Sequence, residues 1–231
     1  MADILAVDDD PVVRETIRHV LSECGHSVSL ATDGQQALDM LHRAPADLVI
    51  LDIMMPEING LDVCRRIRAD PYLAKLPVIF LTSKDRPTDV AEGLNAGGDD
   101  FLSKTAIRIE LPARLQALLR RMPGGFLDPD SDHLVLGDMK LHTVLLELEI
   151  GARRFQLTPV EHRLMHYLMI QNGQPASTDQ LLEDVWGYHE GTGDPKLVRV
   201  AIARLRAKIE PKPDDPQYIL NIRGRGYLLI G

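Results

Sequence analysis

Four apolar segments of this 231-residue chain each lead to a side chain that can do chemistry. Asp8 and Asp9 follow the first segment, Asp52 the second, Thr82 the third and Lys104 the last. In a parallel α/β sheet, ligands bind in the crevice outside the carboxyl ends of the strands. If the four segments are strands of such a sheet, these residues converge on one pocket that holds three carboxylates, a hydroxyl and an ammonium group.

Three carboxylates in one place repel one another, and a divalent cation with oxygen ligands relieves that repulsion. Mg2+ is the natural cation where phosphate is also bound. We therefore expect Asp8, Asp9 and Asp52 to be Mg2+ ligands, with the backbone carbonyl of Met54 completing the coordination. Asp10 belongs to a different feature, because it precedes a proline and has the position of a helix N-cap.

The same pocket predicts phosphoryl transfer to a carboxylate. Once a metal screens its charge, Asp52 can attack phosphorus as a nucleophile and form an aspartyl phosphate. Lys104 would then give a positive charge to one phosphate oxygen, and Thr82 a hydroxyl donor to another. A lysine after a strand is, by itself, usually a surface charge. The prediction therefore rests on the combination of these residues.

Residues 1–121 resemble the receiver domain of two-component systems. The resemblance rests on an early acidic pair, a phospho-acceptor Asp, a Met-Pro-x-x-x-Gly motif, a Thr and a late Lys, which here are Asp8-Asp9, Asp52, residues 55–60, Thr82 and Lys104. It implies a flavodoxin-like, doubly wound α/β fold with a five-stranded parallel sheet, and transfer of a phosphoryl group from a sensor histidine kinase to Asp52. It also implies that Thr82 and Phe101 act as a switch. The only catalysis expected is slow self-phosphorylation and dephosphorylation at Asp52, so the chain is not expected to be an enzyme.

The chain departs from this family at the residue after the late lysine. Receivers usually have a proline there, in a cis peptide that aims the lysine, whereas this chain has Lys104-Thr105. A cis bond without proline costs about 3 kcal/mol. We therefore expect a trans peptide and a different direction for the Lys104 side chain.

Length and composition predict a two-domain protein, since 231 residues suffice for two domains of about 100 to 120 residues. No apolar run approaches the roughly twenty residues that span a bilayer, and no signal peptide precedes the first strand. We expect a soluble cytoplasmic protein with no membrane partner. Its domains are predicted at residues 1–121 and 133–231, joined by a linker at residues 122–132 that contains three Asp, two Pro and two Gly.

The second half has the pattern of an α+β winged helix-turn-helix domain. Short strand patterns at residues 134–136, 140–141, 143–150 and 153–157 predict a small antiparallel sheet. Capping signals at Thr158, Ser177 and Asp194 then predict three helices, and residues 218–230 a closing β-hairpin. In the third helix Val198, Ile202, Leu205 and Ile209 form the predicted buried face.

The distribution of charge favours DNA binding by one part of this domain. The whole chain has a net charge of -8, which argues against a general nucleic-acid binder. Residues 196–225, however, hold eight Lys/Arg and three Asp/Glu, whereas residues 123–195 hold four basic and twelve acidic residues. We therefore assign DNA contact to the third helix and the hairpin tip. The predicted contact residues are Lys196, Arg199, Ala203, Arg204, Arg206, Arg223 and Arg225.

Residues 134–230 resemble the effector domain of OmpR/PhoB-type response regulators. The resemblance rests on the motifs Leu157-Thr158-Pro159-x-Glu161, Val185-Trp186, Ala203-Arg204-Leu205-Arg206-x-Lys208 and Arg223-Gly224-x-Gly226-Tyr227. It implies binding to direct repeats in promoter DNA, commonly as a head-to-tail dimer of effector domains. It also implies contact with RNA polymerase through the loop between the second and third helices, at about residues 187–193.

The receiver resemblance further implies a homodimer built on the fourth helix, fifth strand and fifth helix. Asp100 and Arg114 match one intersubunit ion pair of the family, and Glu110 matches half of another. Val90 stands where the basic partner of that second pair is usual. Because exposed ion pairs contribute only about 0 to 1 kcal/mol each, we expect a dimer that is weaker than usual.

Together these features predict a transcription regulator in which phosphorylation of Asp52 promotes dimerisation and promoter binding. One alternative is a DNA-binding regulator whose receiver dimerises without phosphorylation, suggested by Thr105 and Val90. The other is a Mg2+-dependent aspartyl-phosphate hydrolase with the same acidic pocket. The chain offers no convincing second acid/base for rapid turnover of an external substrate, which argues against that enzyme.

Overall fold

The computed structural model describes residues 1–83, 92–120, 133–142, 145–188 and 193–231, except for the side chains of residues 117 and 120. Its contacts divide the chain into two compact units, Met1–Leu119 and Arg120–Gly231, and each is described by itself. The linker expected at residues 122–132 and the position of Val90 lie outside the described residues.

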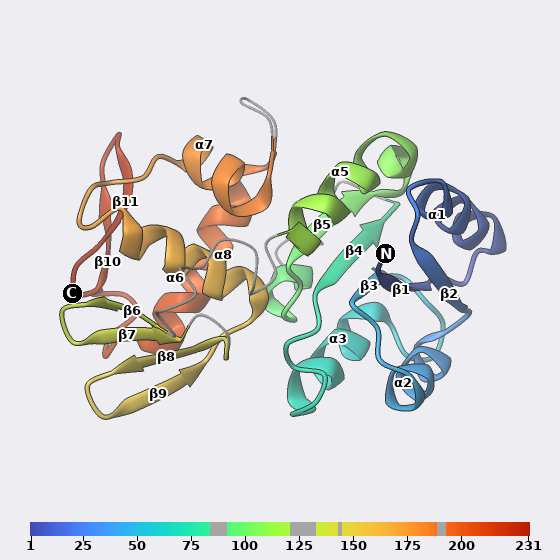
Figure 1. Cartoon of the computed structure of the whole chain (residues 1–231), viewed down its shortest axis with the longest axis horizontal. Coiled ribbons are helices and arrows are strands. Elements are labelled where there is room, and N and C mark those ends of the chain that lie inside the picture. The colour runs from blue at the N-terminus through green and yellow to red at the C-terminus, as the bar shows by residue number, and fades with distance from the viewer. Residues whose placement is uncertain (84–91, 121–132, 143–144, 189–192) are drawn as a thin grey trace. The chain divides into compact units, whose positions relative to one another are not determined.

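The first unit is built on a five-stranded parallel sheet, which confirms the predicted fold class. Its strands run in the order β2-β1-β3-β4-β5 (Figure 1). β3 and β4 are buried at every position, as expected for central strands that are covered on both faces. The strands are β1 (Asp3–Val7), β2 (Ser27–Ala31), β3 (Leu48–Asp52), β4 (Val78–Thr82) and β5 (Asp100–Ser103).

Helices cover the two faces of this sheet and bury a separate apolar cluster on each (Figure 1). One cluster joins Ile17 of α1 and Leu111 of α5 to Ile50 of the sheet. The other joins Leu38 of α2 and Ile67 of α3 to residues of the same strands. These four helices are α1 (Pro11–Glu23), α2 (Gly34–Arg43), α3 (Gly60–Ala69) and α5 (Ile107–Arg120).

The register of the strands brings their carboxyl ends to one edge of the sheet. Val7 pairs with Leu51, Asp52 pairs with Leu81, and Thr82 pairs with Ser103. The chain leaves β1 through Asp10, whose side chain accepts a hydrogen bond of 2.7 Å from the Val12 N–H and caps α1, as predicted. Residues that follow β1, β3, β4 and β5 therefore meet at one place.

The second unit begins with an antiparallel sheet of four strands in the order β6-β7-β8-β9. β8 is shorter than the strand expected from residue 143, because Leu146 has a left-handed backbone with φ of 52° and lies in a turn. Residues 143 and 144 lie outside the described part. The strands are β6 (His133–Leu136), β7 (Met139–His142), β8 (Glu147–Ile150) and β9 (Arg153–Gln156).

Three helical segments and a β-hairpin complete this unit, which confirms the winged-helix prediction. α6 (Pro159–Ile170) and α7 (Thr178–Leu181) both begin with a capping box, and α7 continues as a π-helical turn over Leu182–Trp186. α8 (Pro195–Ile209) buries the expected Val198, Ile202, Leu205 and Ile209. β10 (Ile219–Ile222) and β11 (Gly226–Leu229) form the hairpin, called the wing below.

No helix in the described part of either unit is long and apolar enough to cross a membrane.

Candidate functional site

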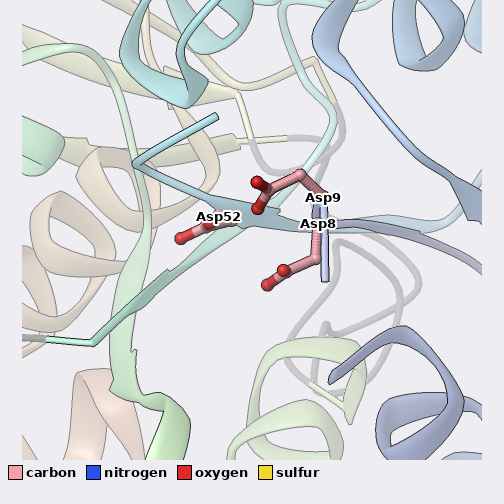
Figure 2. A group of neighbouring side chains, drawn as sticks. All are labelled: Asp8, Asp9 and Asp52. Atoms are coloured by element: carbon pink, nitrogen blue, oxygen red, sulfur yellow. The ribbon is translucent and has the colours of Figure 1, made fainter. Parts of the chain in front are cut away.

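Three carboxylates meet at the edge of the first sheet. Asp8 and Asp9 follow β1, Asp52 ends β3, and one oxygen of each lies within 4.8 Å of the others. Figure 2 shows the three carboxyl groups directed toward a common space. Asp8 and Asp52 are buried and Asp9 is exposed, so the cluster is open on one side.

Lys104 neutralises part of this acidic cluster. Its Nζ lies 2.7 Å from Asp8 Oδ2 and 2.9 Å from Asp52 Oδ2, so it bridges two buried carboxylates. No peptide bond of the described residues is cis, and the bond to Thr105 is therefore trans, as expected. The expected change in the direction of the lysine is wrong, because a short 3-10 turn over Lys104–Ala106 carries the side chain into the pocket. The hydroxyls of Ser103 and Thr105 lie 2.8 Å apart across the base of this turn.

Burial and charge act in opposite directions on the pKa values of the pocket. Burial raises the pKa of Asp52, and the hydrogen bond from Lys104 offsets only part of that rise. Burial alone would lower the pKa of Lys104, but its hydrogen bonds to Asp8 and Asp52 raise the pKa above the usual value. The ammonium group therefore stays charged and holds the two carboxylates together.

The donor set of this pocket fits Mg2+. Asp52 Oδ1 is buried and has no hydrogen-bond partner among the described residues. An oxygen of this kind, beside two further carboxylates with a single lysine between them, provides the hard anionic ligands that Mg2+ prefers. The Met54 carbonyl belongs to the segment that directly follows β3, and its role as a ligand stays a prediction.

Gly60 explains the spacing of the Met-Pro-x-x-x-Gly motif. The Gly60 N–H donates a 3.0 Å hydrogen bond to the Ile53 carbonyl, so the loop after β3 folds back onto the strand. A Cβ atom at residue 60 would lie 2.0 Å from the Asp52 carbonyl oxygen. Only glycine lets α3 start this close to the acceptor residue.

We expect Gly60→Ala to displace the backbone at Asp52. The substitution should lower the free energy of unfolding by about 1 to 3 kcal/mol, as overpacking does, and slow labelling of the chain by acetyl phosphate. Gly25→Ala is the control for an added methyl group, because a Cβ atom at residue 25 meets no neighbour within 4 Å. Its φ of 81° strains an alanine there, whereas Gly60 has no positive φ. Equal labelling rates for the two variants would contradict this account of the motif.

Thr82 and Phe101 lie on the neighbouring strands β4 and β5. Thr82 ends β4 and is 2% exposed. Phe101 is half-buried in β5, pairs in register with Phe80, and packs against the apolar cluster on the α2 and α3 face. The structure thus places the Thr82 hydroxyl at the carboxyl end of β4 and the Phe101 ring on the edge strand β5. The movement of the two as a switch stays a prediction.

Arg14 is a residue of this site that the sequence did not reveal. Its Nη1 donates a 2.6 Å hydrogen bond to the backbone carbonyl of Asp8 from the first turn of α1. Asp8 Oδ1 also accepts a hydrogen bond of 2.9 Å from the Asp10 N–H. The sequence feature that could have revealed it is an arginine six residues after Asp8, in the first turn of the helix that follows the strand.

The predicted DNA-contact residues separate into exposed and internally bonded groups. Lys196 is half-buried, with its side chain 37% exposed, and Arg199 and Ala203 on α8 are exposed, as are Arg223 and Arg225 at the wing tip. The remaining two arginines are partly buried and have partners within the effector unit, and their contact with DNA stays a prediction. Arg204 forms an ion pair of 3.3 Å with the buried Glu161, and Arg206 donates two hydrogen bonds to the Ile219 carbonyl.

The residues expected between two receivers contact one another within the chain. Arg114 Nη1 lies 3.2 Å from Asp100 Oδ1, and Arg114 Nη2 lies 2.5 Å from Glu110 Oε2. Asp100 is fully buried. An intersubunit pairing would have to exchange these partners, and such a pairing stays a prediction.

Comparison with known proteins identifies both units. Residues 4–116 match the family model of the response regulator receiver domain, and residues 152–229 match that of the transcriptional regulatory protein C terminal domain. The chain is 40% identical over 224 residues to the DNA-binding response regulator MtrA of Mycolicibacterium smegmatis, with 97% of this chain and 95% of that protein covered. It is 41% identical over 226 residues to the response regulator MprA of Mycobacterium sp. strain KMS, with 98% and 96% covered.

Solved structures give the same result. DrrB of Thermotoga maritima, described as an OmpR/PhoB homolog, is similar over 100% of both chains with 28% identity and a TM-score of 0.52. A mutant of RitR matches over 100% of both chains with a TM-score of 0.74, and its 24% identity supports the fold alone. Because family models and full-length relatives agree on both domains, this chain belongs to the OmpR/PhoB family of two-component response regulators and is a DNA-binding transcription regulator.

Proposed function

We propose that phosphorylation of Asp52 controls promoter binding by this regulator. The proposal is supported above all by the position of Lys104, whose Nζ lies 2.7 Å from Asp8 Oδ2 and 2.9 Å from Asp52 Oδ2. A carboxylate beside a fixed cation, at the open edge of the sheet, is an acceptor site for a phosphoryl group. The donor is the phosphohistidine of a sensor kinase, whose P–N bond breaks as an Asp52 oxygen bonds to phosphorus.

Each residue of the pocket has a part in this transfer. Asp8, Asp9, Asp52 and the Met54 carbonyl would hold Mg2+, which when bound neutralises charge on the phosphoryl oxygens. Lys104 exchanges its ion pair with Asp52 for one with a phosphate oxygen. Arg14 holds the Asp8 backbone in place through its 2.6 Å hydrogen bond.

The side chains of Thr82 and Phe101 transmit the phosphorylation of Asp52 to the surface of the receiver. Thr82, at the end of β4, turns its hydroxyl toward the phosphoryl group, and the ring of Phe101 on β5 moves into the space that the hydroxyl leaves. This conformer dimerises through the face of α5 and β5 that contains Asp100, Glu110 and Arg114. A ligand that stabilises one conformer shifts the population toward it.

Dimerisation raises the local concentration of two effector domains on DNA. The exposed side chains of α8 and the wing then bind direct repeats in promoter DNA in the cytoplasm, as a homodimer. RNA polymerase contacts the loop at about residues 187–193, of which 189–192 lie outside the described part.

The mass of the full chain in solution tests this proposal. With Mg2+ alone we expect a monomer by light scattering, and with Mg2+ and beryllofluoride, an acyl-phosphate mimic, a dimer. The Asp52→Asn variant should stay a monomer in both conditions. A dimer of wild type and variant without beryllofluoride would favour the alternative regulator that dimerises independently of phosphorylation, which the uncharged side chain of Val90 suggests. A monomer in every condition would contradict control by dimerisation.

A further inference from the structure

The carboxyl end of α8 binds the start of the wing through Glu210. This residue caps α8 and is 6% exposed. Its two carboxylate oxygens accept hydrogen bonds from three consecutive backbone N–H groups: Gln217 at 2.8 Å, Tyr218 at 3.0 Å and Ile219 at 2.9 Å. Hydrogen bonds to an ionised acceptor are roughly twice as strong as neutral ones. Glu210 therefore fixes the backbone that leads into β10.

Arg206 binds the same place from one helical turn earlier. Its Nε and Nη2 donate hydrogen bonds of 3.0 and 2.7 Å to the Ile219 carbonyl. The N–H and the C=O of Ile219 are thus bound by the side chains of the α8 C-cap Glu210 and of Arg206. Ile219 is itself fully buried and pairs with Leu229 of β11. The carboxyl end of the helix therefore binds both backbone groups of Ile219, the first residue of the hairpin.

The other strand of the wing is attached elsewhere. Tyr227 of β11 exchanges two backbone hydrogen bonds with Ala176, of 2.7 and 2.9 Å, in the segment before α7. At the tip, the Arg225 N–H donates to the Ile222 carbonyl at 2.9 Å, which closes a tight turn. The wing is therefore attached at two places: β11 to Ala176, and the start of β10 to the side chains of Arg206 and Glu210.

We propose that Arg206 and Glu210 are positioning residues that hold the wing tip at a fixed place relative to the exposed face of α8. The helix and the wing then bind DNA as one surface, and the contribution of Arg223 and Arg225 to affinity depends on Glu210. The inference rests on DNA binding by the effector domain and not on phosphorylation of Asp52. It also gives Arg206 a role that requires no contact with DNA.

The test is a double-mutant cycle in the full chain. The variants are Glu210→Gln, the wing variant Arg223→Ala with Arg225→Ala, and the combination of all three substitutions. The probe is a duplex enriched from a random-sequence library by the wild-type chain, and Kd is measured by fluorescence anisotropy from about 50 to about 200 mM salt. Asp215→Asn is the matched control, since it removes one negative charge from an exposed residue of the same loop.

We expect the wing variant to bind about tenfold more weakly than wild type and to lose about one unit of salt slope for each arginine. In the Glu210→Gln background, truncation of the two arginines should weaken DNA binding less than about threefold, because the arginines are already displaced. Glu210→Gln alone should weaken binding and lower the salt slope, although it removes a negative charge. Loss of a negative charge should by itself strengthen binding to DNA. Asp215→Asn should therefore bind DNA as tightly as wild type or slightly more tightly.

An equal cost of the wing truncation in both backgrounds would overturn the proposal. So would an unchanged salt slope in Glu210→Gln. If the wing variant binds as tightly as wild type, the wing makes no contact for Glu210 to position, and the proposal fails while DNA binding by the regulator stands. Arg206→Met, which keeps the aliphatic stem and removes both bonds to Ile219, gives a second cycle with the same expected coupling should Glu210→Gln unfold.

Discussion

Asp52→Asn is expected to abolish labelling of the full chain by radiolabelled acetyl phosphate in the presence of Mg2+. The amide keeps the size of the side chain but loses the anionic oxygen that attacks phosphorus and binds the metal. The pocket should keep its shape, because Lys104 retains its ion pair with Asp8 at 2.7 Å. We therefore expect loss of labelling without loss of folding, which circular dichroism checks.

Asp10→Asn is the matched control for this experiment. It makes the same change two residues from Asp8, at a side chain that caps α1 and takes no part in the carboxylate cluster. Asparagine is as good an N-cap as aspartate, so this variant should label at the wild-type rate. Labelling that persists in Asp52→Asn would place the acceptor at another residue.

Glu161→Ala is expected to lower the stability of the effector unit by about 3 to 5 kcal/mol. Glu161 is 1% exposed and forms ion pairs with Arg204 at 3.3 Å and Lys208 at 2.6 Å. It also completes the capping box of α6 by accepting from the Thr158 N–H at 2.9 Å. Removing one partner of a buried ion pair leaves uncompensated charge, which is the costly case.

The single tryptophan makes this measurement specific to the effector unit. Trp186 is 2% exposed within that unit, so its fluorescence reports unfolding there during a urea titration. Gln180→Ala is the control, since it removes the corresponding side chain of the α7 capping box, where no ion pair is involved. It should cost about 1 kcal/mol or less. Similar losses in the two variants would contradict a dominant role for the ion pairs.

The same ion pairs give the stability of the effector unit a dependence on pH. Burial alone would raise the pKa of Glu161, but the charges of Arg204 and Lys208 lower it below the usual value of 4.5. Below that value the unfolded chain binds a proton that the folded chain does not, so this contribution is complete above about pH 4.5 and is lost as pH falls through the lower, folded pKa. In Glu161→Ala the stability should change less over this acidic range.

The strand ends were predictable because each one combines two independent signals. Asp52 and Thr82 each end an apolar run that folds into a fully buried strand, and their chemistry makes sense only if the strands lie side by side. Parallel topology turns such runs into a single pocket. In the effector unit, capping boxes at Thr158 and Ser177 gave the helix starts for the same reason, since the cap is a local contact between neighbouring residues.

The sequence does not show the partners of charged side chains when those partners lie far along the chain. Arg204 is predicted to contact DNA from its type and position, and that pattern does not show its partner Glu161, which is buried 43 residues earlier at the start of another helix. Arg206 binds a backbone carbonyl that the pattern of side chains does not show. Lys104 was expected to point elsewhere without a following proline, but a local 3-10 turn aims it into the pocket. Helical periodicity places such residues on a face, and only the fold says what occupies that face.

α8 contains residues that bind other parts of the effector unit and residues that are exposed, and this difference bears on how a regulator of this kind acquires a new operator. Its last two turns carry Arg204, Arg206 and Lys208, which hold the helix to α6 and to the wing. Arg199 and Ala203, which lie one helical turn apart on the same helix, are exposed instead. If these two residues contact bases as predicted, we expect that after gene duplication one copy can exchange them and bind a different promoter, while the contacts to α6 and to the wing stay unchanged.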